Sequence, residues 1–181
     1  MRLGNDATLA AMQRRTLLGL SVAGAAVLGA VGGGVAWLYA PALQDGRLLP
    51  VGRTVLAAVA RAVLDGNLPT DPKLYAAAIE AHLTRMQSTI ETLSPASQSE
   101  FGNLLALLAM PPGRLALASL ATPWPEASLS DVQDALQSMR TSRLVLRRQG
   151  YHALRDLTHA AYFSDPSTWP RLGYPGPRAL G

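Results

Sequence analysis

The chain has 181 residues, a formal net charge of +4 and no cysteine, and 49% of its residues are hydrophobic. Without cysteine it can form no disulfide, no cysteine-bound zinc or iron–sulfur centre and no covalent haem attachment. The small basic excess comes without a recognisable nucleic-acid-reading module, so we expect no binding to nucleic acid.

Two adjacent arginines precede a long uncharged segment near the N-terminus. Arg14 and Arg15 are followed by residues 17–42, which carry no charge and include six glycines and seven alanines. About 20 apolar residues span the hydrocarbon core of a bilayer, and the glycines keep this segment only mildly hydrophobic. We therefore predict that residues 1–42 are an export or transmembrane segment and do not belong to the folded domain.

This segment resembles the twin-arginine signal, which moves folded proteins across the bacterial inner membrane. The residues that match this signal are Arg14, Arg15, Leu17 and Leu18. Gln13 departs from it, because the signal usually has Ser or Thr there. The resemblance implies passage through the twin-arginine translocase and a periplasmic location.

The end of the segment leaves two outcomes open. Ala40-Pro41-Ala42 is a small-x-small site, which predicts cleavage before Leu43. Alternatively, residues 17–40 are never cut and anchor the protein in the inner membrane, because they are long enough to span it.

Residues 43–163 are predicted to form an all-α domain, a bundle of roughly four to six helices joined by short turns. Residues 43–52 have the composition of a linker. Apolar residues then recur at helical spacing, and caps, prolines and glycines divide them into segments. The predicted helices cover residues 53–64, 72–93, 95–109, 114–121 and 131–163, the last with a break or kink at Gly150.

Residues 164–181 are predicted to be an extended tail. Ser164-Asp165-Pro166 would open it with one short turn, after which prolines and glycines prevent a helix and favour a stiff ribbon. Trp169 and Tyr174 would lie on this ribbon. One interpretation is a strap folded over the bundle. The other is an arm that docks on a partner, because rigid aromatic side chains make good interface anchors. Trp124 lies in a proline-rich loop and also has two interpretations. We expect it to fill the core, and the alternative is that it contacts a partner.

The C-terminal motifs resemble a known family. They are Gly150-Tyr151-His152-Ala153-Leu154, Tyr162-Phe163-Ser164-Asp165-Pro166, Trp169 and Gly173-Tyr174-Pro175-Gly176-Pro177. Together they are similar to the small subunits of bacterial flavin dehydrogenases, the group related to gluconate 2-dehydrogenase subunit 3. The resemblance covers residues 10–40 and 95–178 and is most specific at its end.

The resemblance implies a non-catalytic accessory subunit. In that family a large glucose–methanol–choline type subunit holds FAD and oxidises an alcohol or sugar, and a cytochrome c subunit often completes the complex. The small subunit binds and stabilises the large one and escorts it through twin-arginine export. We therefore expect no cofactor, metal or catalytic residue in this chain. The predicted partner-binding residues are Tyr162, Asp165, Trp169, Tyr174, Pro175, Gly176 and Pro177.

Two other functions remain open. His152, Asp156 and His159 could share one helix face and form a metal or acid–base site, which would make the chain an enzyme in its own right. An uncut anchor would suit a membrane-tethered scaffold.

The arginines of residues 140–148 are expected to pair with acidic side chains of the bundle or of a partner. His82 stands alone in the sequence.

Overall fold

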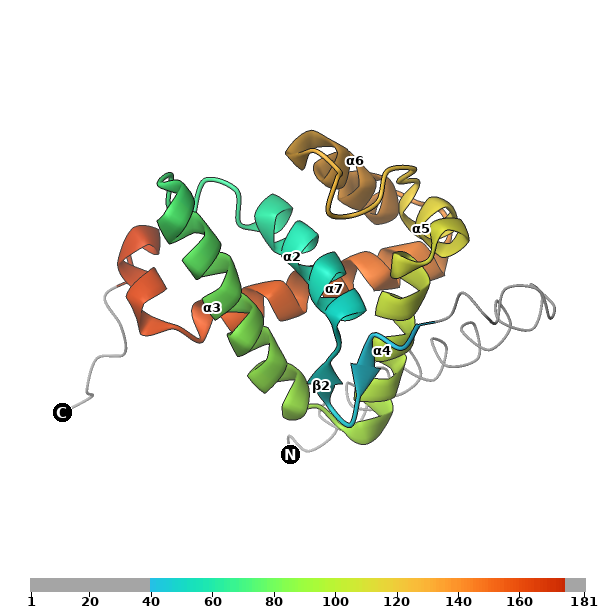
Figure 1. The fold of residues 1–181 in the computed structure, drawn as a ribbon, viewed down its shortest axis with the longest axis horizontal. Helices are drawn as coiled ribbons and strands as arrows, with labels where there is room; N and C mark the ends of the chain where they lie inside the picture. The colour runs from blue at the N-terminus through green and yellow to red at the C-terminus, as the bar shows by residue number, and fades with distance from the viewer. Residues whose placement is uncertain (1–39, 175–181) are drawn as a thin grey trace, which may run out of the picture.

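Six α-helices and a short β-hairpin make up residues 40–174, the part of the chain that the computed structural model describes (Figure 1). The all-α prediction is confirmed for these residues. The predicted export residues Arg14, Arg15, Leu17 and Leu18 lie outside them, as do Pro175, Gly176 and Pro177. The elements in chain order are β1 (Leu43–Gln44), β2 (Arg47–Leu48), α2 (Pro50–Val63), α3 (Pro72–Glu91), α4 (Pro95–Ala109), α5 (Pro111–Ala118), α6 (Leu129–Arg140), α7 (Val145–Phe163) and the 3₁₀ helix η2 (Pro166–Leu172).

Most helix starts follow from local sequence. Asp71 caps α3 by accepting hydrogen bonds from the backbone N–H groups of Lys73 and Leu74, at 2.9 and 3.0 Å. Proline then occupies the first turn, where its missing N–H costs nothing. Ser128 and Asp131 form a reciprocal capping box at the start of α6. These local signals fix where the helices begin without help from tertiary contacts.

Helix α2 forms the centre of the core, and α3, α4, α6 and α7 pack around it (Figure 1). Its side chains Val55, Leu56 and Val59 are fully buried. Trp124, from the loop between α5 and α6, fills the core as predicted and is 2% exposed. Its indole Nε1–H donates to the carbonyl oxygen of Leu108 at 2.7 Å, so the large ring is buried with its polar atom paired.

The predicted linker over residues 43–52 is wrong. The chain forms an antiparallel hairpin in which Leu43 pairs with Leu48, and α2 already begins at Pro50. Asp45 and Gly46 both have positive φ, at 49° and 76°. These values belong to a two-residue type I′ turn, whose twist matches that of the strands it joins.

The boundaries of α5, α6 and α7 also differ from the predictions. Helix α5 begins at Pro111, because proline fits the first turn of a helix as well as it ends one. The region 131–163 splits at residues 141–144, whereas Gly150 lies inside α7 and is buried. A Cβ on Gly150 would lie 3.1 Å from Cε of Met139, so this glycine serves close helix packing.

The prediction of an extended tail is wrong over residues 166–172, which form the 3₁₀ helix η2. Asp165 caps it and Gly173 ends it with a φ of 71°. Among the described residues no single helix is long and apolar enough to cross a membrane. The pair α4 and α5 passes that test only when joined across its 102° bend.

Candidate functional site

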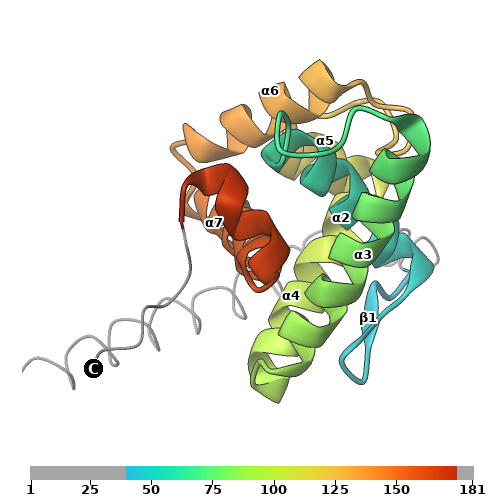
Figure 2. The ribbon, with the colours of Figure 1, turned by 90° about the vertical axis from the view of Figure 1, so that its left-hand side faces the viewer.

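Three elements meet where the described chain ends: the last turn of α7, the helix η2, and α3. Figures 1 and 2 show η2 turning back beside α3. We call this region the C-terminal pole, defined by residues 159–174 and the face of α3 that carries His82 and Arg85. Four of the predicted partner-binding residues lie here: Tyr162, Asp165, Trp169 and Tyr174.

Arg85 holds the pole together. Its Nη1 lies 3.1 Å from Oδ2 of Asp165, and its Nε–H donates to the carbonyl oxygen of Ala161 at 3.2 Å. One guanidinium thus ties α3 both to the end of α7 and to the start of η2. Hydrogen bonds from Ser167 lower the pKa of Asp165, and the charge of Arg85 lowers it further.

Tyr162 and Asp165 make their contacts within the chain. Tyr162 is 5% exposed and belongs to the core, and its hydroxyl lies 3.4 Å from the carbonyl oxygen of Asn67. Asp165 accepts the backbone N–H of Ser167 at 2.9 Å in addition to its ion pair. Both residues therefore stabilise the pole, and Tyr162 is not part of its surface.

The surface of the pole is aromatic. Phe163 and Tyr174 are 41% and 48% exposed. The indole Nε1–H of Trp169 donates to the carbonyl oxygen of Phe163 at 2.8 Å, and its ring packs edge-on against Tyr174 at a centroid distance of 5.4 Å. We call Phe163, Trp169 and Tyr174 the aromatic cluster. A hydrogen bond holds the ring of Trp169, and ring contacts with Tyr162 and Trp169 hold those of Phe163 and Tyr174, so little side-chain freedom would be lost on binding a partner.

A buried imidazole lies beneath this surface. His82 is 1% exposed, and neither of its ring nitrogens has a hydrogen-bond partner among the described residues. Burial, and secondarily the charge of Arg85, lowers its pKa to about 4, so the ring is neutral near pH 7. It borders a cavity of about 190 Å³ between α3 and η2, which Leu68 and Thr168 also line. The sequence offered no interpretation for His82.

The structure does not gather His152, Asp156 and His159 into one site. His152 is exposed and its ring lies against Tyr151, whereas the carboxylate of Asp156 pairs with Arg155 at 3.2 Å. Burial lowers the pKa of His159, whose ring lies 5.6 Å from that of Phe163. Within residues 40–174 no three or more His, Asp or Glu side chains are placed to hold a metal ion.

The arginines of residues 140–148 do not bind the acidic partners that we expected from the bundle. Arg147 donates to the hydroxyl oxygens of Ser119 and Ser138, at 2.8 and 2.7 Å. Arg148 donates to the backbone carbonyl of Ser142 at 2.7 Å. The three ion pairs of the described region lie elsewhere, at Arg53–Glu80, Arg85–Asp165 and Arg155–Asp156. Neutral oxygens therefore bind these guanidinium groups inside the fold, although Nε of Arg147 is buried without a hydrogen-bond partner among the described residues.

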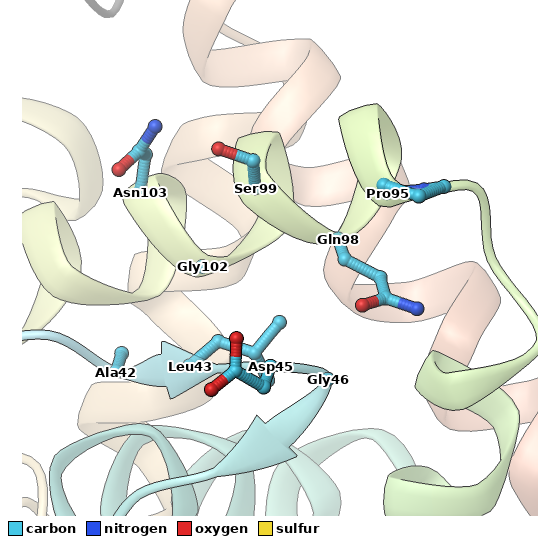
Figure 3. Close-up of a pocket in the computed structure, with 9 residues that line it drawn as sticks. All are labelled: Ala42, Leu43, Asp45, Gly46, Pro95, Gln98, Ser99, Gly102 and Asn103. Carbon is cyan, nitrogen blue, oxygen red and sulfur yellow. The ribbon is translucent and has the colours of Figure 1, made fainter.

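A second hollow lies at the opposite end of the described chain. A cavity of about 300 Å³ separates the hairpin from the first turns of α4. Figure 3 shows Gln98 pointing from α4 toward Gly46 in the hairpin turn. Ala42, the residue before β1, is 1% exposed. The predicted cleavage position therefore lies inside the folded domain.

Comparisons of the chain with protein-family models, with curated proteins and with solved structures gave no significant match. The family resemblance therefore remains a prediction from the motifs. The sequence did not reveal Arg85, because its partners Ala161 and Asp165 are distant in the chain and no short motif joins them. The hairpin did have a local signal, Asp45-Gly46, since Asp-Gly favours a type I′ turn.

Proposed function

We propose that this protein is a non-catalytic accessory subunit that binds a FAD-containing alcohol or sugar dehydrogenase and escorts it through twin-arginine export. FAD is loaded inside the cell, so an enzyme that carries it must cross the membrane already folded. A partner with paired arginines could supply the signal for both chains.

The observation that supports this function best is the aromatic cluster, fixed at one end of the domain. Phe163 and Tyr174 keep nearly half of their surface exposed. Aromatic side chains with few rotatable bonds are the typical anchors of protein interfaces. The hydrogen bond from Trp169 to the carbonyl of Phe163 and the Arg85–Asp165 pair hold the cluster in place before any partner binds.

The export role is tested by replacing both Arg14 and Arg15 with Lys. This keeps the two charges and removes only the planar guanidinium groups. We expect the dehydrogenase activity of the periplasm to fall by about tenfold or more, with the large subunit retained in the cytoplasm. Arg2→Lys, a change of the same kind outside the motif, is the control and should export normally. Undiminished export of the large subunit from the double variant would exclude the escort role.

A further inference from the structure

We infer that the folded domain protects its own Ala42–Leu43 bond from signal cleavage, so that the uncharged segment stays attached and holds the protein at the membrane. This inference rests on the proposed export signal. It concerns a different step, the fate of the segment after folding, and it decides between the two outcomes that the Ala40-Pro41-Ala42 site leaves open.

The bond is enclosed on its N-terminal side. Ala42 is 1% exposed, whereas Ala40 and Pro41 are exposed. The carbonyl oxygen of Ala42, which belongs to the scissile bond, accepts the backbone N–H of Leu49 at 3.0 Å. A Cβ added to Gly52 would come within 2.5 Å of that oxygen. Helix α2 therefore lies directly against the carbonyl that a peptidase would have to attack.

The bond is less enclosed on its C-terminal side, where Leu43 is half-buried. Leu43 is paired with Leu48 in the hairpin. A Cβ added to Gly102 would lie 2.9 Å from Cβ of Leu43, so α4 packs closely against this residue. Figure 3 shows the side chain of Leu43 extending from β1 toward α4, the helix that carries Gly102.

The other strand of the hairpin is attached to α3. The backbone N–H of Leu48 donates to Oε1 of Gln87 at 2.6 Å, and Nε2 of Gln87 donates to the carbonyl oxygen of Gly46 at 2.8 Å. Exposing the Ala42–Leu43 bond thus requires the hairpin to leave three helices. Proteases cut exposed, locally opened backbone, so folding and cleavage at this bond exclude each other.

The order of events then determines the outcome. A chain that folds before export reaches the peptidase with the site already closed. The uncut residues 17–40 are long enough to span a bilayer. Because the exposed residues Ala40 and Pro41 lead directly into the buried Ala42, no flexible spacer separates the segment from the domain. The hairpin and the first turns of α4 would lie next to the lipid headgroups.

The test uses the full-length chain in detergent micelles, treated with purified bacterial signal peptidase and read out by intact mass. The comparison variant carries a Gly/Ser spacer of about 8 residues between Ala42 and Leu43, which places the same site outside the fold. A control variant carries the same spacer between Thr70 and Asp71, two exposed residues far from the site in the chain. Helical circular dichroism verifies that all three chains are folded.

We expect the wild-type and control chains to keep their full mass and the Ala42 spacer variant to lose residues 1–42. Cleavage of the wild-type chain would overturn the inference. Survival of all three chains would overturn it as well, because burial would then not be the cause of protection. The assay needs no export, so its outcome does not depend on the result of the Arg14 and Arg15 experiment.

Discussion

Arg85 of α3 and Asp165 at the start of η2 form an ion pair, with Nη1 and Oδ2 separated by 3.1 Å, and both side chains are about a quarter exposed. Because Arg85 also donates to the carbonyl oxygen of Ala161, it joins three elements of the C-terminal pole. The aromatic cluster depends on η2 for its position, so its geometry depends on this arginine.

Replacing Arg85 by Met should therefore loosen η2 while leaving the bundle folded. We expect the free energy of unfolding to fall by only about 1 kcal/mol, because a partly exposed ion pair is weak. Amide hydrogen exchange over residues 164–174 should rise much more than over α2. The matched control is Arg53→Met, which removes the more exposed pair with Glu80. Equal exchange at the pole in both variants would show that Arg85 does not hold η2.

The aromatic cluster should carry the affinity for the flavin-containing partner that we propose. We expect Trp169→Ala or Tyr174→Ala to weaken binding about tenfold or more, in the range of interface anchor residues. The dissociation constant of the purified pair measures this. Leu115 is 58% exposed on α5, away from the pole, so Leu115→Ala is the control and should bind normally. If the control weakened binding and the two aromatic variants did not, the interface would lie elsewhere.

His82 should make the fold sensitive to mild acid. Its pKa is lowered to about 4 in the folded chain and has a usual value of 6.5 in the unfolded chain. The unfolded state therefore binds this proton first as the pH falls, and stability is lost between pH 6.5 and pH 4. A shift of this size corresponds to about 3 kcal/mol.

Urea unfolding of the wild type and of His82→Leu at several pH values tests this prediction. The Leu variant should lose less stability over that window, and the loss that remains includes that of His159, whose pKa burial also lowers. At pH 7 it should be at least as stable as the wild type, because two unpaired buried nitrogens are removed. The pKa of the neighbouring Asp165 is lowered from its usual value of 3.8. Its protonation therefore changes the stability at lower pH than that of His82. Parallel pH profiles for the two chains would assign the acid sensitivity to other groups.

Gly52 should tolerate no side chain. Its added Cβ would meet the backbone oxygen of Ala42 at 2.5 Å, and backbone cannot rotate away as a side chain can. We expect Gly52→Ala to cost about 1–3 kcal/mol, the usual range for overpacking. Gly66→Asn is the control, because Gly66 has a φ of 78°, open space around it and a replacement that accepts this conformation. Urea unfolding measures the stability of both variants. Equal stability of the two would contradict the prediction.

The sequence predicted the helices best where a cap and a proline coincide. Asp71-Pro72 and Ser94-Pro95 mark the starts of α3 and α4 correctly, because these signals act within one turn. The same reasoning failed at Pro111, since proline after a helix can also begin the next one. It failed at Gly150 because a buried glycine can serve packing against Met139 and need not break the helix.

The candidate site was predictable only in part. The sequence singled out Trp169 and Tyr174, and the structure leaves the ring of Tyr174 exposed. It could not foresee that Tyr162 turns inward or that His82 is buried without a partner, because both depend on how α3 meets α7. The sequence predicted only one short turn where the 3₁₀ helix η2 begins, because the prolines that follow resemble those of an extended ribbon.

Trp124 has a role beyond filling space. In a continuous helix the carbonyl of Leu108 would accept the amide hydrogen four residues later, but that residue is Pro112, which has none. The indole N–H at 2.7 Å supplies the missing donor from a different loop. Replacing Trp124 by Phe would keep an aromatic ring in the core but would leave the carbonyl oxygen of Leu108 without this donor. The bend between α4 and α5 thus depends on a hydrogen bond that Trp124 donates. Pro112 and Trp124 should therefore be substituted together or not at all.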